Sequence, residues 1–138
     1  MPTYQDKIAI AIRADLLEWQ KLNVAAFLAS AVAVNIPETH GRRFLTSDQA
    51  EYLAFVRNPM LIYRAESAQQ LRRALVRAKE RGLRVGIYTK PLFATKGEDE
   101  NLAEIANLPD EEQDLVGIVI YGDNKQVGKA LDGLKFHP

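Results

Sequence analysis

Polar residues follow two of the strands that the sequence predicts, and their types suit recognition of a polar ligand. These residues are Arg13, Asp15, Lys21 and Asn23 after one apolar run, and Thr89, Lys90 and Thr95 after another. Ligands of open α/β sheets bind beyond the carboxyl ends of parallel strands, beside helix N-termini, so we expect one shared mouth. Guanidinium, ammonium and amide groups there favour a small polar or anionic ligand.

A second interpretation of the same residues needs no ligand. Asp15 can cap the following helix and pair with Arg13, while Lys21 and Lys90 stay in solvent. Lys21 lies two residues before Asn23, and residues two apart face different sides of a helix. The sequence leaves both interpretations open, and it assigns no catalytic residue.

Other kinds of site have little support. The chain has no cysteine, which excludes disulfides, thiol catalysis and cysteine-ligated metals. His40 and His137 lie far apart with no third ligand at metal spacing, and neither a Ser-His-Asp arrangement nor a phosphate-binding glycine loop is present. We therefore predict no metal and no cofactor.

The elements that must position the mouth begin with a central strand. Ile8 to Ile12 is apolar on both faces, as expected for a strand covered on both sides. A long helix starts near Asp15, and the spacing predicts that Val24, Phe27, Leu28, Ala31 and Val32 face the core. This helix leads into an irregular connection, residues 35–58, in which residues 47–56 could form a short helix.

The best-marked helix follows a second strand at Met60–Tyr63. Ser67 and Gln70 form a capping box, and Gly82 ends the helix. Its basic residues make the one concentrated basic surface, which we interpret as a solvated face: Arg72, Arg73, Arg77, Lys79 and Arg81.

Two further strands, at residues 85–88 and 115–121, flank a long acidic loop, residues 89–114, and one more helix uses Val127, Ala130, Leu131 and Leu134. The order predicts an α/β protein in which residues 1–138 form one domain with three α/β/α layers and a four-stranded mixed sheet.

Composition narrows the class of protein. The chain is 47% hydrophobic, and 18 basic residues balance 18 acidic ones, so a large nucleic-acid footprint is not expected. The segment from Met1 to Lys7 is not followed by a signal-peptide core, and the longest apolar stretch is too short for a membrane span. We expect a cytoplasmic protein without a membrane partner.

Several motifs carry a resemblance to known proteins. Ile12-Arg13-Ala14-Asp15-Leu16, Asn23-Val24-Ala25-Ala26, Arg81-Gly82-Leu83 and Gly133-Leu134-Lys135-Phe136 resemble, in order, motifs of the type II peptidyl-tRNA hydrolases. Together they cover nearly the whole chain and imply that fold. Trp19 to Val24, Asp114 to Gly117 and the ending Gly133 to Pro138 are closer to an uncharacterised bacterial family of unknown function within that superfamily.

The departures from the hydrolases fall on their catalytic positions. The resemblance places Asn23 where those enzymes have a lysine, and Lys90 near the position of an aspartate. An asparagine cannot act as a general acid, so peptidyl-tRNA hydrolysis is not expected.

Three functions stay open. The first is a non-hydrolytic binding or regulatory domain for a small polar or anionic ligand. The second is a divergent hydrolase of an ester or amide that recruits Lys21, Asp15 or Thr95. The third is an oligomeric module, such as a homodimer, that uses the apolar residues 44–56.

Overall fold

The fold places helices on both faces of a mixed sheet in a computed structural model, which describes residues 5–138. Residues 1–4 lie outside the described residues. They belong to the N-terminal segment for which no signal peptide was predicted. The strands are β1 (Asp6–Arg13), β2 (Phe44–Leu45), β3 (Glu51–Tyr52), β4 (Met60–Ala65), β5 (Arg84–Thr89), β6 (Leu115–Asp123) and β7 (Lys135–Phe136). The helices are α1 (Glu18–Asn35), α2 (Ala68–Glu80), α3 (Glu98–Ala106) and α4 (Asn124–Ala130), with short 3₁₀ turns η1 (Pro37–Thr39), η2 (Lys90–Ala94) and η3 (Asp110–Glu112).

The main sheet has five strands in the order β5-β6-β1-β4-β7, and not the predicted four. β1 and β4 are parallel, whereas β6 runs antiparallel to both of its neighbours, β1 and β5. The strand that the sequence did not reveal is β7, whose two residues pair with the end of β4 through Tyr63↔Phe136 and Arg64↔Lys135. Two residues are too few for a periodic pattern, so only the pairing identifies it.

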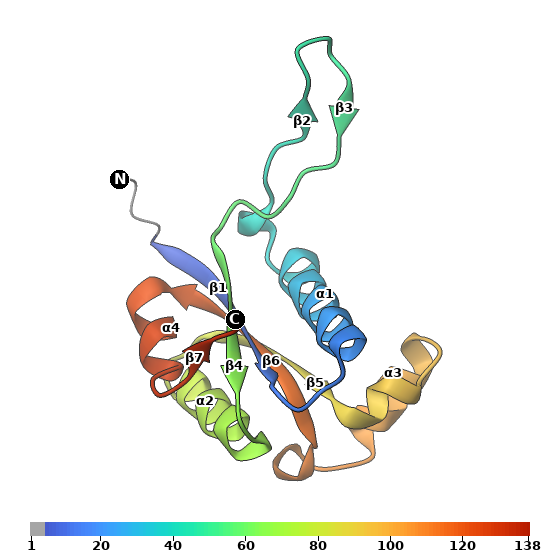
Figure 1. The fold of residues 1–138 in the computed structure, drawn as a ribbon, viewed down its shortest axis with the longest axis vertical. Helices are drawn as coiled ribbons and strands as arrows, with labels where there is room; N and C mark the ends of the chain where they lie inside the picture. Colours follow the sequence, from blue (N-terminus) through green and yellow to red (C-terminus); the bar gives the residue numbers. More distant parts are fainter. Residues whose placement is uncertain (1–4) are drawn as a thin grey trace.

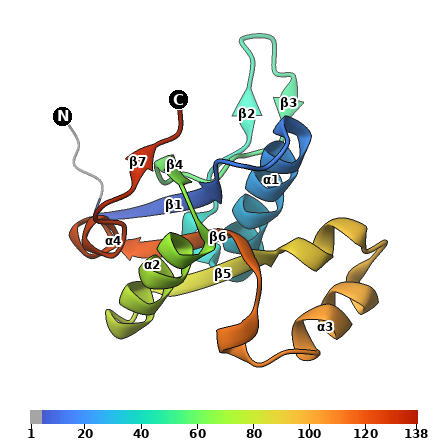
Figure 2. The ribbon, with the colours of Figure 1, turned by 60° about the horizontal axis from the view of Figure 1, so that its bottom comes forward.

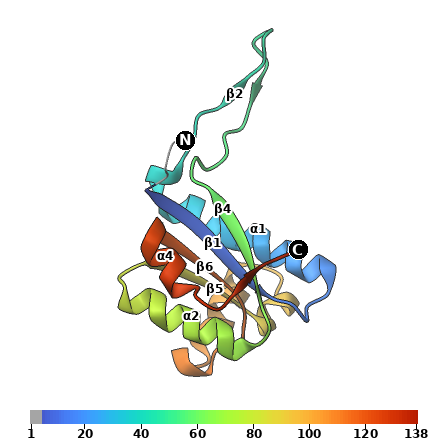
Figure 3. The ribbon, with the colours of Figure 1, turned by 60° about the vertical axis from the view of Figure 1, so that its left-hand side comes forward.

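Helices cover both faces of this sheet, which gives the predicted three layers (Figures 1 and 3). On one face, α1 packs its residues Val24, Leu28 and Val32 against Ile8, Ile10 and Ile12 of β1. On the other, α2 and α4 cover Ala9, Ala11, Ile118 and Ile120. All of β1 from Ile8 to Ile12 is buried, as predicted for a central strand.

The helix α1 begins at Glu18, near Asp15 as predicted, but its buried face differs from the prediction. Asp15 does not cap the helix, because Leu17 is the N-cap residue, and the Asp15 carboxylate accepts from Arg13. Phe27 was expected in the core, yet its side chain is 55% exposed. The apolar character of α1 continues around its circumference, so spacing alone could not separate the buried stripe from the outer one.

The two irregular regions also differ from the predictions. Residues 47–56 do not form a helix; β2 and β3 pair as a hairpin that projects away from the domain (Figures 1 and 3). Its turn is closed by Thr46, whose carbonyl accepts from Gln49 N–H and whose hydroxyl accepts from Ala50 N–H, both at 3.0 Å. Residues 89–114, predicted as a loop, contain η2, α3 and η3.

The α2 prediction is confirmed in its bounds and largely in its cap. The Ser67 hydroxyl accepts from Gln70 N–H at 3.2 Å, although the Gln70 side chain accepts from Glu66 N–H and not from Ser67. Gly82 ends the helix with a φ of 68°, a conformation that glycine adopts without strain. Among the helices of residues 5–138, none has the length and apolar character that a bilayer crossing requires.

Candidate functional site

The sheet topology brings the predicted mouth residues to one end of the molecule. β1, β4 and β5 all run toward this end, where β6 begins, since Arg13 lies opposite Ala65 and Thr89 opposite Leu115. Two distinct environments occur there: a cluster of charges after β1, and an aromatic cleft beside α1. The two environments differ in how many of their polar groups already have a hydrogen-bond or ion-pair partner.

The charged cluster is held together by Arg13. Its Nε and Nη2 donate to the two carboxylate oxygens of Asp15 at 3.0 and 2.7 Å, and its Nη1 lies 3.6 Å from Asp114 Oδ1. The hydrogen bond from Arg13 lowers the pKa of Asp15, and the nearby Lys90 ammonium adds to this effect. The same bond raises the pKa of Arg13. Both groups therefore stay charged at neutral pH, and Asp15 is a weak base.

The cleft lies between the first half of α1 and the segment from Tyr88 to Asn101, and its volume is about 570 Å³. Its aromatic walls are linked: Trp19 and Phe93 meet edge to face with centroids 5.8 Å apart, and Tyr88 lies 5.1 Å from Phe93 and 6.1 Å from Phe27. Burial raises the pKa of Tyr88, so its phenol stays neutral. A cleft of this size and lining suits a small molecule with a planar or apolar part.

Polar groups occupy defined positions in the same cleft. Asn23 projects from α1 one turn after Trp19, and its amide makes no side-chain hydrogen bond within residues 5–138. Thr95 donates to the Leu92 carbonyl at 2.8 Å and also lies within hydrogen-bond reach of the Asn101 side-chain oxygen. That contact occupies the Asn101 side-chain oxygen, and the Asn101 NH₂ group makes no hydrogen bond within residues 5–138. Lys96 and Glu98 complete the lining.

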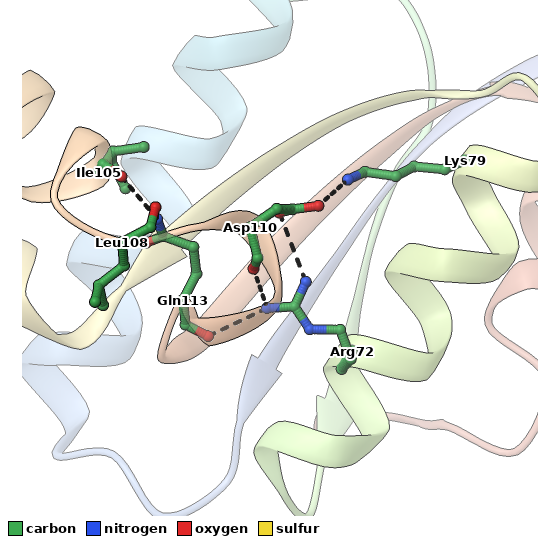
Figure 4. Close-up of polar contacts among 6 residues, drawn as sticks. All are labelled: Arg72, Lys79, Ile105, Leu108, Asp110 and Gln113. Atoms are coloured by element: carbon green, nitrogen blue, oxygen red, sulfur yellow. Dashed lines mark hydrogen bonds and ion pairs between the residues drawn. The ribbon is translucent and has the colours of Figure 1, made fainter.

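The wall of the cleft formed by α3 depends on a segment that follows it in the chain. Gln113 is nearly buried, and its NH₂ group donates to the carbonyls of Ile105 and Leu108 at 2.7 and 3.0 Å (Figure 4). Asp110 accepts from Lys79 Nζ at 2.6 Å, and Arg72 donates to the carbonyls of Asp110 and Gln113. These bonds join the end of α3 to α2, which is part of the domain core.

The predicted site residues thus separate into groups. Asn23 and Thr95 line the cleft, whereas Arg13 and Asp15 pair with each other. Lys90 is exposed beside Asp15 and does not line the cleft; Thr89 is buried where the ladder with β6 shifts register. Lys21 is half-buried on α1, away from Asn23. Ligand binding by these residues stays a prediction.

Sequence reasoning missed most of the cleft lining. Trp19, Asn23 and Phe27 recur every four residues, which puts them on one face of α1, and this spacing could have revealed the wall. Phe93, Lys96 and Asn101 carried no such signal, because their segment was interpreted as a loop. Within residues 5–138, no group of three or more His, Asp or Glu side chains could hold a metal ion.

The basic face of α2 is partly neutralised by its own chain. Arg72 and Lys79 bind the segment 110–113, and Arg77 donates to the Asp132 carbonyl at 3.0 Å. A shallow hollow between α2 and α4 retains Arg77, Arg81, Lys125 and Lys129. The solvated face predicted for this helix is therefore a surface half engaged in intramolecular contacts.

A comparison with solved structures finds a protein of the same fold, and the comparisons name no function. A solved structure of a protein of unknown function from Agrobacterium tumefaciens strain C58 superposes with a TM-score of 0.91 at 29% sequence identity. The match covers 99% of this chain and 100% of that one. No curated protein matches the sequence. The model of the family described as "Protein of unknown function (DUF2000)" matches residues 6–138, and the chain therefore belongs to that family.

Proposed function

We propose that this protein is a non-hydrolytic binding domain whose ligand occupies the cleft between α1 and α3. The observation that carries the proposal is the combination of linked aromatic walls with the Asn23 amide, which has no partner within residues 5–138, in a space of about 570 Å³. Planar ligands stack on or abut aromatic rings, and unpaired amides select ligands that can replace lost water hydrogen bonds. The ligand class is a small polar molecule with a flat or apolar portion.

The charges around the cleft favour a neutral or anionic ligand. Lys96 is exposed at the rim and has no ion pair within residues 5–138, whereas the Arg13 and Asp15 charges neutralise each other. Glu98, also on the rim, opposes a strong preference for anions. A carboxylate or phosphate near Lys96 is expected to strengthen binding modestly, since exposed ion pairs contribute about 1 kcal/mol or less.

Within residues 5–138, the cleft threonine lacks an activating base, which separates this proposal from hydrolysis. Thr95 supplies the aliphatic hydroxyl of the cleft, and its hydrogen-bond partners are the Leu92 carbonyl and the Asn101 side-chain oxygen, neither of which is a general base. Glu98 also lines the cleft, but it forms no hydrogen bond with Thr95. Asp15, which a divergent hydrolase could recruit, is held by Arg13 with a lowered pKa. A hydroxyl without a base beside it is a poor nucleophile.

The peptidyl-tRNA hydrolase II-like fold remains part of the proposal, supported by the ordered motifs from Ile12 to Phe136. A divergent hydrolase of an ester or amide is the alternative that this fold suggests. Fold alone does not choose between the two, because function depends on the site.

Binding can be tested with paired probes that share a ring and hydrogen-bonding groups but differ in charge. Adenosine against its 5′-monophosphate, and N-acetylphenylalaninamide against N-acetylphenylalanine, are suitable for thermal-shift assays and calorimetry. We expect at least one pair to bind, and we expect Asn23→Leu to weaken that binding about tenfold by removing one hydrogen-bonding group. The matched control is Asn107→Leu, because Asn107 is an exposed asparagine outside the cleft.

Two results would contradict the proposal. One is equal loss of binding in the two asparagine variants, which would place the ligand elsewhere. The other is hydrolysis of simple esters or of peptidyl-tRNA at rates that fall in Asn23→Leu or Thr95→Val, which would establish the alternative.

A further inference from the structure

The outer face of α1 is uncharged over most of its length. From Leu22 to Asn35 the helix contains no charged residue, although the side chains of Leu22 and Val34 are 67% and 78% exposed. Ala26 and Ser30 are exposed between them. A helix that is apolar all round is buried in a folded assembly, and large exposed apolar surfaces mark interaction sites. This stripe, Leu22-Ala26-Ser30-Val34, lies beside the cleft and not in it.

A second apolar surface lies on the projecting hairpin, residues 41–56, which we call the arm. Its large side chains are between 47% and 79% exposed: Phe44, Leu45, Tyr52, Leu53 and Phe55. The arm is firmly rooted, because Gly41 N–H donates to the Phe55 carbonyl at 3.0 Å and Arg57 N–H to the Thr39 carbonyl at 2.7 Å. Its strands, however, pair through only two residues each. A two-stranded hairpin is marginal by itself in water, so the arm is expected to gain its stability from a contact.

The dimensions of the two surfaces match. Each half of the arm has eight residues and so reaches about 26 Å at roughly 3.3 Å per residue. The 18 residues of α1 span about 27 Å at roughly 1.5 Å per residue. The arm starts at the carboxyl end of α1 and continues away from the domain (Figure 1). A two-fold axis near the arm's base would therefore lay each arm along the other copy's α1.

The area also favours a second copy over an unrelated protein. If each of the five exposed arm side chains buries about 100 Å², one arm and the surface receiving it bury about 1,000 Å² together. One such contact is at the weak end of protein interfaces, whereas two exchanged arms bury about 2,000 Å², enough for a stable dimer. In a closed two-fold dimer the same contact occurs twice, so the buried area doubles without any further kind of contact.

We propose that two copies of this chain form a dimer by exchanging arms, each arm lying on the partner's α1 stripe. In this arrangement the base of the arm is opposite Val34, Leu45 is near Ala26, and the tip is near Leu22. The interface keeps the aromatic cleft open, since Asn23 and Phe27 lie on the adjacent side of α1. Dimerisation is therefore independent of the ligand proposed above.

Sedimentation velocity with the full chain measures the assembly. We expect a dimer, and we expect Leu53→Glu on the arm and Ala26→Glu on α1 each to raise its dissociation constant at least a hundredfold. Both side chains are exposed, so the variants should fold, which circular dichroism verifies. Val76→Glu is the control, because Val76 is an exposed apolar residue on α2, behind the sheet, and should leave the dimer intact.

Disulfide trapping tests the arrangement itself, and the cysteine-free sequence makes it clean. A mixture of Leu45→Cys and Ala26→Cys proteins should form a mixed disulfide under mild oxidation, whereas Leu45→Cys with Val76→Cys should not. A wild-type chain that is monomeric up to about 100 μM overturns the proposal, since even weak interfaces are populated there. A dimer that survives both glutamate variants, or that links only arm to arm, overturns it as well.

Discussion

The helices α1 and α2 cover opposite faces of the same sheet, yet their outer surfaces differ in kind. Both bury a stripe of leucine, valine or alanine, represented by Leu28 in α1 and Leu75 in α2. The outer side of α2 carries arginine and lysine residues that bind carbonyls and carboxylates of the same chain. The outer side of α1 carries apolar side chains and the unpaired Asn23.

This difference separates a helix surface whose charges are partly satisfied by the same chain from one that leaves apolar side chains exposed to water. Arg72 and Lys79 of α2 hold the 110–113 segment in place, so the interactions of these two cations are satisfied within one chain (Figure 4). The α1 surface leaves apolar area in water, at an unfavourable free energy of about 25 cal/mol per Å². The cleft and the proposed arm exchange both use α1, one on each side of its outer surface. Figure 1 shows α3 near the start of this helix, and Figure 2 shows α2 apart from it.

Truncating a buried side chain of α1 or of α2 should give the largest loss of stability. The two losses should be equal, because both side chains are packed against the sheet. Leu28→Ala and Leu75→Ala remove side chains that are 2% and 1% exposed, so each should lower the free energy of unfolding by about 3 kcal/mol. Urea unfolding in the Leu53→Glu background avoids a contribution from dimer dissociation. Leu22→Ala in that background should cost less than about 0.5 kcal/mol. A large loss for Leu22→Ala would mean that the outer face of α1 is already buried within one chain.

The next largest loss of stability is expected at Gly117, where α1 lies in close contact with the sheet. A Cβ atom on Gly117 would lie 2.5 Å from Val24 Cγ1 and 3.1 Å from Leu28 Cδ1. Gly117→Ala should therefore destabilise by about 1–3 kcal/mol through overpacking, measured by urea unfolding. Gly97→Ala is the matched control, since it would have open space around its Cβ. If Gly117→Ala is neutral, α1 can shift on the sheet and its inner packing is looser than that of α2.

The contrast between these helices also explains what the sequence could and could not predict. α2 has charged and apolar sides with a marked start and end, so Ser67, Leu71 and Gly82 fixed its position. α1 has no such contrast, and the exposure of Phe27 could not be inferred. The cleft joins α1 to residues more than 60 positions away in the chain, such as Phe93 and Asn101. That proximity depends on tertiary contacts of Gln113 and Asp110, which leave no local pattern.

Substitutions at the N-termini of α1 and α2 test the same comparison, with smaller expected changes in the free energy of unfolding. The Ser67 hydroxyl caps α2, whereas α1 begins after Leu17, which has no side-chain group to accept an N–H. Ser67→Ala should lower the free energy of unfolding by about 1 kcal/mol. Leu17→Ser should raise it by about 0.5 kcal/mol, because Leu17 already has extended backbone geometry and an exposed side chain. Thermal unfolding of the two variants measures both changes, and a loss in Leu17→Ser would show that Leu17 packs against something that the single chain does not contain.

The ion pairs of α2 should give the smallest effect, and one that depends on pH. The hydrogen bond from Lys79, with a further contribution from Arg72, lowers the pKa of Asp110 below its ordinary value of 3.8. The unfolded chain thus binds more protons than the folded one in this range, so the stabilisation is present above pH 3.8 and is lost as the pH falls through the lowered value. Because the Asp110 side chain is 57% exposed, Asp110→Asn should cost less than about 1 kcal/mol at neutral pH. The difference from wild type should shrink in acid and at high salt. Glu111→Gln is the control, since Glu111 forms no ion pair within residues 5–138. If Asp110→Asn loses no stability at neutral pH, the stabilisation comes instead from the Asp110 backbone carbonyl that Arg72 binds, and the 110–113 segment is fixed without the Asp110 carboxylate.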